Sequence, residues 1–432
     1  MGIVHFGIGA FHRAHQAWYT DRAMDHGDRN WAITGVSLRS RTVACQMNPQ
    51  DGLYTVTERS PGNDLTRVVG AVRHVIPANR ARYRVENLLA ASSTRIASFT
   101  VTEKGYCRAP DGSLDPDLAD DNSIYAFLAA GLHRRRVAGL PGLTLLSCDN
   151  LAANGAQLRH LLGEYLDRRD PGLRAWFERE CTCPSTMVDR IVPSVTESDL
   201  RVVASRLGLE DAAAVVTETF SQWIIEDSFA AGRPRWHEVG ADLVHDVAPY
   251  ETAKLRMLNG AHSLLAYLGL AAGHTFVDQA VADPAIRPLV ERLMREEALP
   301  SVTAAPGQNL RVYADALLAR FANPALRHKL AQIAMDGSQK IPQRWLETLT
   351  WHRRAGRTCP AILSGIGAWL RHVRGDNGAV DDPLADQLQR AWAEAGEAEI
   401  VAAVFGRLIA SHDWAMSSAD QRIIAEQIGR GP

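Results

Sequence analysis

Short apolar runs alternate with helix-length segments throughout the first half of the chain, and this alternation restricts the possible folds more than any other feature. The runs lie at residues 2–9, 31–38, 95–102, 143–150 and 185–193, the first being GIVHFGIG. Such runs predict buried strands or strand ends, and the segments between them can hold crossover helices. We therefore expect an α/β domain of the Rossmann type, with a doubly wound parallel sheet.

Strand-like runs become scarce after about residue 246, where long amphipathic stretches rich in Ala, Leu, Arg and Glu begin. The stretches cover residues 251–272, 284–297, 309–334, 361–373, 384–410 and 418–429. With 432 residues the chain is long enough for two cores. We expect a Rossmann-type dinucleotide-binding domain at 1–245 and a mainly α-helical substrate domain at 246–432.

Charge, hydropathy and cysteine usage argue against several classes of protein. Lys and Arg total 47 against 49 Asp and Glu, and no basic run is long enough to favour nucleic-acid binding. No apolar stretch reaches the roughly 20 residues of a membrane span, and the N-terminus has no signal-peptide pattern. We expect a cytoplasmic protein, monomeric or a small homo-oligomer, that binds neither nucleic acid nor membrane and keeps its six cysteines as thiols.

The first predicted strand runs directly into a glycine-containing turn, GIGAFH, at residues 7–12. In a dinucleotide-binding fold, Gly7 makes the tight turn and Gly9 lets the backbone approach a pyrophosphate. His12 stands where the usual motif has its third glycine, so an ordinary strand-to-helix turn is an alternative. The position of the turn on the first strand favours a cofactor site.

The segment after the second predicted strand, GVSLRSRT, bears on the choice of cofactor. It contains no carboxylate to bind an adenosine ribose. Arg39 and Arg41 could instead meet a 2′-phosphate or stack on adenine, or could simply be solvated surface residues. The residues themselves therefore leave NAD and NADP open.

Polar side chains follow the third and fourth predicted strands. TVTEKGYC carries Thr102 and Glu103, and SCDN carries Asp149 and Asn150. Ligands bind at the carboxyl edge of parallel strands, so we expect these loops to face the nicotinamide, although loop solvation alone would explain each residue singly. The expected cofactor contacts are Gly7, Ile8, Gly9, Ala10, Phe11, Arg39, Thr102 and Glu103.

One helical stretch, KLRMLNGAHS, combines an apolar face with Lys254, Asn259 and His262. At 100° per residue, Asn259 lies about 140° and His262 about 80° from Lys254, so the three share one side of a helix. A lysine whose pKa is lowered by burial can act as the base in alcohol oxidation. The amides of Asn150 and Asn259 can then hold the reacting oxygen, and His262 can position a neighbouring hydroxyl. Structural roles in the core are the alternative, and we expect no metal.

Several strings together resemble the polyol-specific long-chain dehydrogenases, a family of mannitol 2-dehydrogenases and fructuronate reductases. They are GIGAFHRAHQA, TVTEKGYC, SCDN, MVDRIVP, QWIIEDSF, KLRMLNGAHS, LAYLGL and IAMDGSQKIPQR, and they span residues 7–344. The resemblance implies an NAD-binding Rossmann-type domain, a helical second domain and metal-independent catalysis by a lysine. It also implies catalytic roles for Lys254, Asn150, Asn259 and His262, and places Asp189 and Lys340 among the family's substrate residues.

Within the family, TEKGYC with Lys104, and Gln332 in QIAMDGSQKIPQR, look more like fructuronate reductases than mannitol dehydrogenases. The carboxylate of a uronate needs a cationic partner. The candidates are Lys104, Arg190, Lys340 and Arg344, some of which can be surface charges. The resemblance thus implies an NAD-dependent enzyme that interconverts D-fructuronate and D-mannonate by hydride transfer at C2. A mannitol 2-dehydrogenase and a non-catalytic dinucleotide-sensing protein are the alternatives.

Overall fold

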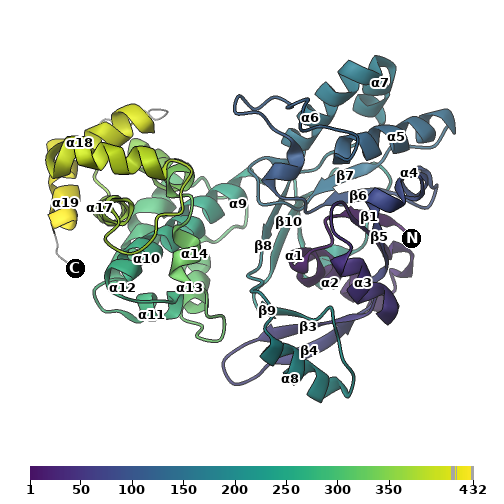
Figure 1. Cartoon of the computed structure of the whole chain (residues 1–432), viewed down its shortest axis with the longest axis horizontal. Coiled ribbons are helices and arrows are strands. Elements are labelled where there is room, and N and C mark those ends of the chain that lie inside the picture. Colours follow the sequence, from purple (N-terminus) through teal and green to yellow (C-terminus); the bar gives the residue numbers. More distant parts are fainter. Residues whose placement is uncertain (410–413, 415, 430–432) are drawn as a thin grey trace. The chain divides into compact units, whose positions relative to one another are not determined.

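The computed structural model describes residues 1–409, 414 and 416–429, which fall into two compact units, Met1–Ala248 and Pro249–Pro432 (Figure 1). The first unit ends at Ala248. Each unit has its own hydrophobic core. The core residues of the first unit all precede residue 242, and those of the second lie between 253 and 428.

A five-stranded parallel sheet forms the centre of the first unit. Its strands, in spatial order, are β5 (Val72–Pro77), β2 (Ile33–Ser37), β1 (Ile3–Phe6), β6 (Ile96–Phe99) and β7 (Thr144–Ser147). From β1 the chain adds strands first on one side and then on the other. The switch point of the topology, where ligands bind in such sheets, therefore lies between β1 and β6.

Short connections and helices surround this sheet. The helices are α1 (Ala10–Ala14), α2 (Gln16–Asp25), α3 (Thr42–Met47), α4 (Arg82–Ala90), α5 (Ile124–Val137), α6 (Asn154–Arg169) and α7 (Pro171–Glu180). The short 3-10 segments are η1 (Arg29–Trp31), η2 (Asn48–Gln50), η3 (Ala78–Arg80), η4 (Glu103–Tyr106) and η5 (Trp236–Val239).

Two smaller sheets complete the unit. One joins β4 (Leu65–Val69), β3 (Tyr54–Arg59) and β9 (Val215–Glu218), and the other joins β11 (Asp242–Val244), β10 (Gln222–Glu226) and β8 (Thr186–Asp189). The run expected at 185–193 is thus a strand, but β8 pairs antiparallel with β10 and lies outside the parallel sheet. Its apolar residues predict burial, whereas the partner strand depends on tertiary structure.

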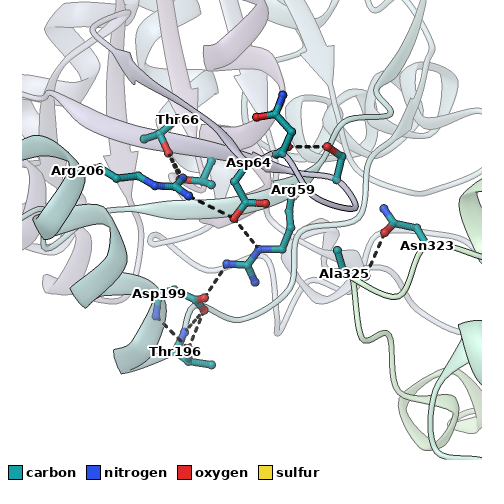
Figure 2. A network of polar contacts seen from close by, with 11 residues as sticks. Arg59, Asp64, Thr66, Thr196, Asp199, Arg206, Asn323 and Ala325 are labelled. Atoms are coloured by element: carbon teal, nitrogen blue, oxygen red, sulfur yellow. Dashed lines mark hydrogen bonds and ion pairs between the residues drawn. The ribbon is translucent and has the colours of Figure 1, made fainter.

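Helix α8 (Glu197–Leu207) is tied to the β3–β4 hairpin by the polar network of Figure 2. The Arg59 guanidinium lies 2.7 Å from Asp199 and 3.7 Å from Asp64, and Asp64 also lies 3.8 Å from Arg206. Thr196 and Asp199 form a capping box at the start of the helix. Because each ion pair is partly exposed, we expect the network to orient α8 more than to stabilise it.

The second unit is almost entirely helical. Its α-helices are α9 (Ala248–Ala253), α10 (Gly260–Ala271), α11 (Val277–Ala282), α12 (Arg287–Arg292), α13 (Leu310–Phe321), α14 (Leu330–Ala334), α15 (Gly337–Ile341), α16 (Glu347–Arg354), α17 (Pro360–Arg374), α18 (Ala385–Ala403) and α19 (Ser418–Gly429). Four π-helical segments extend them, η6 (Lys254–Asn259), η7 (Leu293–Ala298), η9 (Pro342–Leu346) and η10 (Val404–Leu408), with a 3-10 turn η8 (Leu299–Ser301) after η7.

The expected helix at 309–334 is interrupted, so that prediction was wrong. Helix α13 ends at Phe321 and α14 begins only at Leu330. Pro324 lies in the gap, and proline both lacks an N–H and disfavours helical geometry in the residue before it. Of the stretch expected at 384–410, residue 410 lies outside the described residues. In the part of the chain that the structure describes, no helix has the length and apolar character to cross a bilayer.

Candidate active site

The turn after β1 has the shape that a dinucleotide cradle needs. Gly7 has a φ of +93°, and a Cβ at this position would lie 1.9 Å from the carbonyl oxygen of Thr100. The Gly9 N–H donates to the Gly7 carbonyl at 2.7 Å. A Cβ at Gly9 would meet nothing closer than 4.0 Å, so the backbone there is open to a ligand. Gly7 closes the turn and Gly9 leaves room for a phosphate.

Two buried histidines, His5 and His12, pack next to this turn. His5 bonds through Nδ1 to the Ser98 hydroxyl at 2.8 Å and through Nε2 to the Thr100 hydroxyl at 2.9 Å. Thr100 in turn donates to the Gly7 carbonyl at 2.6 Å. The His12 ring, at the place of the missing third glycine, stacks on His5 with 3.4 Å between ring centroids. Burial lowers the pKa of His5 to about 3, so the imidazole that braces the turn is neutral.

The other residues expected to meet the cofactor near this turn differ in exposure. Ile8 is buried and packs against Gly35, so its side chain belongs to the core. Ala10 and Phe11 are half-buried at the start of α1. Arg39 is exposed in the loop after β2. The structure thus leaves Arg39, and the backbone around Gly9, available to a ligand.

The loops after β6 and β7 meet at the carboxyl edge of the sheet. The Asp149 carboxylate accepts hydrogen bonds from the backbone N–H groups of Val101 and Thr102 at 3.0 and 2.9 Å. Thr102, Glu103 and Lys104 are exposed on the first loop, and Asn150 is exposed on the second. The sequence indicates Asp149 but assigns it no role, because two of its hydrogen-bond donors are backbone amides, which carry no sequence signal.

Asp189 and Arg190 follow each other at the end of β8, and both are buried. The Arg190 guanidinium pairs with Glu58 and donates to the backbone carbonyls of Ala14 and Glu218. The side chain has no exposed surface, and burial lowers its pKa. These contacts favour a structural role for Arg190 over the substrate contact expected from the sequence.

In the second unit, Lys254 and Asn259 begin and end the π-helical segment η6. The stretch expected as one regular helix at 251–272 is therefore wrong at this point. A π-helix bonds residue i to residue i+5, which brings residues five apart onto one face, whereas an α-helix separates them by about 140°. The π-turn thus places Lys254 and Asn259 together. Lys254 and His262 are buried, and Asn259 is half-buried.

His262 lies among cations and apolar rings. Burial first, and then the charges of His328, Arg320 and Arg344, lower its pKa well below the ordinary value. Its ring lies 4.7 Å from that of Phe321. The Nε2 atom has no hydrogen-bond partner among the residues that the structure describes. A neutral imidazole with a buried, unbonded nitrogen is suited to bind a hydroxyl group.

Arg344 provides a positive charge next to the same helix. Its Nη1 donates to the Ser263 hydroxyl at 2.8 Å and to the Asn259 carbonyl at 3.3 Å, and burial lowers its pKa to about 10. No carboxylate pairs with it within the described ranges. Lys340 donates to the Met335 carbonyl, and burial lowers its pKa also. Among its described residues, the second unit therefore carries a guanidinium without an acidic partner.

Groupings that could hold a metal are absent from residues 1–409, 414 and 416–429. All six cysteines are free thiols.

Comparison with known families identifies the chain. Residues 1–238 match the mannitol dehydrogenase Rossmann domain, and residues 246–416 match the mannitol dehydrogenase C-terminal domain. The chain belongs to the mannitol dehydrogenase family. The family resemblance expected from the sequence is confirmed, as is the fold of a Rossmann-type domain followed by a helical one.

Individual members of the mannitol dehydrogenase family are similar over nearly the whole chain. The D-mannonate oxidoreductase of Escherichia coli K12 is 40% identical over 94% of this chain and 87% of its own. The mannitol 2-dehydrogenase of Aspergillus terreus is 38% identical over 91% and 83%. The solved Pseudomonas fluorescens mannitol 2-dehydrogenase, a ternary complex with NAD and D-mannitol, has a TM-score of 0.83 and 33% identity and covers 100% of this chain and 90% of its own.

Proposed function

We propose that this member of the mannitol dehydrogenase family is an NAD-dependent oxidoreductase that interconverts D-fructuronate and D-mannonate. In the reductive direction the C2 ketone takes a hydride at carbon, which NADH would supply, and a proton at oxygen. Relatives named D-mannonate oxidoreductase and mannitol 2-dehydrogenase support this reaction class. The choice of a sugar acid rests on Arg344, whose guanidinium has no carboxylate partner within the described ranges and is bonded to the helix that carries Lys254.

The first unit fits the cofactor. The turn at Gly7 and Gly9 leaves room for a pyrophosphate, and the loop with Thr102 and Glu103 lies at the switch point of the sheet. NAD(H), when bound, supplies or accepts the hydride. The residues that would hold it are the backbone of 7–11, Arg39, Thr102 and Glu103.

The second unit supplies the acid–base chemistry. Lys254 donates a proton to the C2 oxygen during reduction and removes it during oxidation. Asn259 and Asn150 donate amide N–H groups to that oxygen, which stabilises the developing alkoxide. Neutral His262 binds a neighbouring hydroxyl through the nitrogen that has no partner in the described chain. We propose substrate contacts also for Asp189, Lys104 and Lys340.

Substrate preference tests the sugar-acid assignment. We expect kcat/KM for NADH oxidation with D-fructuronate to exceed that with D-fructose about 10- to 150-fold, because a hydrogen bond to a charged group contributes about 1.5–3 kcal/mol. A preference for fructose would contradict the assignment. It would favour a mannitol 2-dehydrogenase, the function carried by the name of the solved relative bound to D-mannitol.

Replacing Arg344 identifies the carboxylate partner. Arg344→Met should lower kcat/KM for fructuronate by about 100-fold, and Arg344→Lys by less, since an ammonium keeps the charge but loses the planar fork. Arg353→Met is the matched control, because Arg353 is exposed and forms no ion pair among the described residues. Equal effects of Arg344→Met and Arg353→Met would mean that the carboxylate is bound elsewhere.

A further inference from the structure

We propose that the Asp149 carboxylate is a positioning group for the cofactor. It holds Thr102 in a backbone conformation that threonine rarely adopts, and so fixes the loop that meets the nicotinamide half of NAD(H). This inference rests on the proposed function, because it takes the carboxyl edge of the parallel sheet as the cofactor site.

Thr102 has a strained backbone. Its φ is +66° and its ψ is 167°, a region of backbone conformation populated almost only by glycine. The β-branched side chain of threonine increases the strain. Hydrogen bonds hold the residue on both sides. Its N–H donates to Asp149 Oδ1 at 2.9 Å, and its carbonyl accepts from the Gly105 N–H at 2.9 Å. Without the hydrogen bond to Asp149, Thr102 would lower its free energy by rotating to an ordinary φ.

The carboxylate that holds Thr102 is itself firmly placed. Asp149 Oδ2 accepts from the Val101 N–H at 3.0 Å and from the Tyr106 hydroxyl at 2.9 Å. The same hydroxyl contacts Ser147, the last residue of β7, at 2.5 Å. Asp149 and Tyr106 are buried. Both carboxylate oxygens therefore face the loop after β6, so Asp149 acts through that loop.

The loop lies where the position of its backbone affects the cofactor. It follows β6, the strand beside β1 at the switch point of the sheet. Thr100, two residues before Thr102, touches Gly7 through both its carbonyl and its hydroxyl. Glu103 and Lys104 follow Thr102 directly. Relaxation of Thr102 would move the residues on both sides of the expected nicotinamide position.

A double-mutant cycle on the full-length protein tests the inference, with the NADH dissociation constant from fluorescence and kcat/KM as readouts. Asp149→Asn replaces one acceptor oxygen with an NH₂ group that faces a backbone N–H. We expect it to weaken NADH binding and lower kcat/KM at least tenfold. In the Thr102→Gly background the same change should cost less than about threefold, since glycine has little to gain by leaving this conformation.

Two further measurements complete the design. Thr102→Gly alone should raise the Tm by about 2 °C, because it removes strain from the native state. Tyr106→Phe keeps both hydrogen bonds from the backbone N–H groups to Asp149. It should lower NADH binding and kcat/KM about threefold, again less in the Thr102→Gly background, and it replaces Asp149→Asn in the cycle if that variant does not fold. Asp111→Asn is the matched control, because Asp111 accepts from Ser113 N–H and Oγ in an exposed loop.

The outcomes separate the two proposals. Equal costs of Asp149→Asn in both backgrounds, or a lower Tm for Thr102→Gly, would overturn the positioning role while leaving the proposed function intact. Failure of the unsubstituted protein to bind NADH would overturn the proposed function, and the positioning role with it.

Discussion

Lysine is rare in this chain, which makes each lysine informative at the residue scale. Of the 47 basic residues only four are lysines, at positions 104, 254, 329 and 340. Lys254 is buried. Arginine stays protonated at all relevant pH values, whereas a buried lysine can lose its proton, so a lysine suits a position where a proton must move.

Lys254→Ala should abolish turnover and leave cofactor binding unchanged. We expect kcat to fall about 10²- to 10⁴-fold, the contribution typical of general acid–base catalysis, while the NADH dissociation constant changes less than threefold. Lys329→Ala is the control, because Lys329 is exposed. Normal function in the Lys254 variant would favour the dinucleotide-sensing alternative.

Arg39 and Arg41 lead us to expect that NADPH is also a substrate. Both are exposed in the loop between β2 and α3, and neither forms an ion pair within the described part of the chain. No acidic residue stands there to repel a 2′-phosphate. We expect kcat/KM with NADPH to lie within about tenfold of that with NADH, and Arg39→Ala with Arg41→Ala to lower the NADPH value about tenfold more than the NADH value. Equal losses with both cofactors would contradict this.

At the scale of elements, the buried Glu297 joins two helical segments in a pH-dependent way. It lies on η7, and its carboxylate accepts from the backbone N–H groups of Ala361 and Ile362 in the first turn of α17. Burial raises its pKa from 4.5 to about 7, against the opposing effect of those two bonds. The folded state therefore holds a proton that the unfolded state releases above pH 4.5.

This shift predicts how stability depends on pH. The contribution of Glu297 is fully present below about pH 4.5 and is lost as the pH rises through about 7, a change of about 3 kcal/mol. The Tm advantage of the wild type over Glu297→Gln should thus shrink between pH 5 and pH 7.5. Glu394→Gln, at an exposed residue of α18 whose charge does not act on Glu297, should show a constant difference from the wild type. A gap for Glu297→Gln that widens with pH would show that the pKa is not raised.

Elements were easier to predict than their details. Apolar periodicity indicated β1, β2, β6, β7 and α17, because burial of a regular face leaves a direct pattern in the sequence. It did not indicate the π-turn at 254–259, since the 100° per residue used to place Lys254, Asn259 and His262 assumes an ordinary α-helix. For the same reason the sequence assigned Lys254 and Asn259 to one site but did not predict the π-turn that brings them onto one face. Hydrogen bonds to backbone amides, such as those of Asp149, have no sequence pattern at all.

At the scale of the whole molecule, the two units have separate cores, and the proposed function assigns cofactor binding to the first and proton transfer to the second. A fragment of residues 1–248 should fold and bind NADH with a dissociation constant within about tenfold of the full chain, because its core uses only its own residues. It should show no turnover, because it lacks Lys254. Circular dichroism and NADH fluorescence measure both. A fragment that is unfolded would mean that the second unit is needed to form the first.

The π-turn at Lys254–Asn259 also affects how the length of the chain relates to its chemistry. Losing one residue between these two positions would leave the lysine and the asparagine four residues apart, and residues four apart in an ordinary α-helix also lie on one face, about 40° from each other. The π-turn therefore accommodates one additional residue without separating the pair. A relative whose alignment has a single gap here can present the same two side chains together from an ordinary helix.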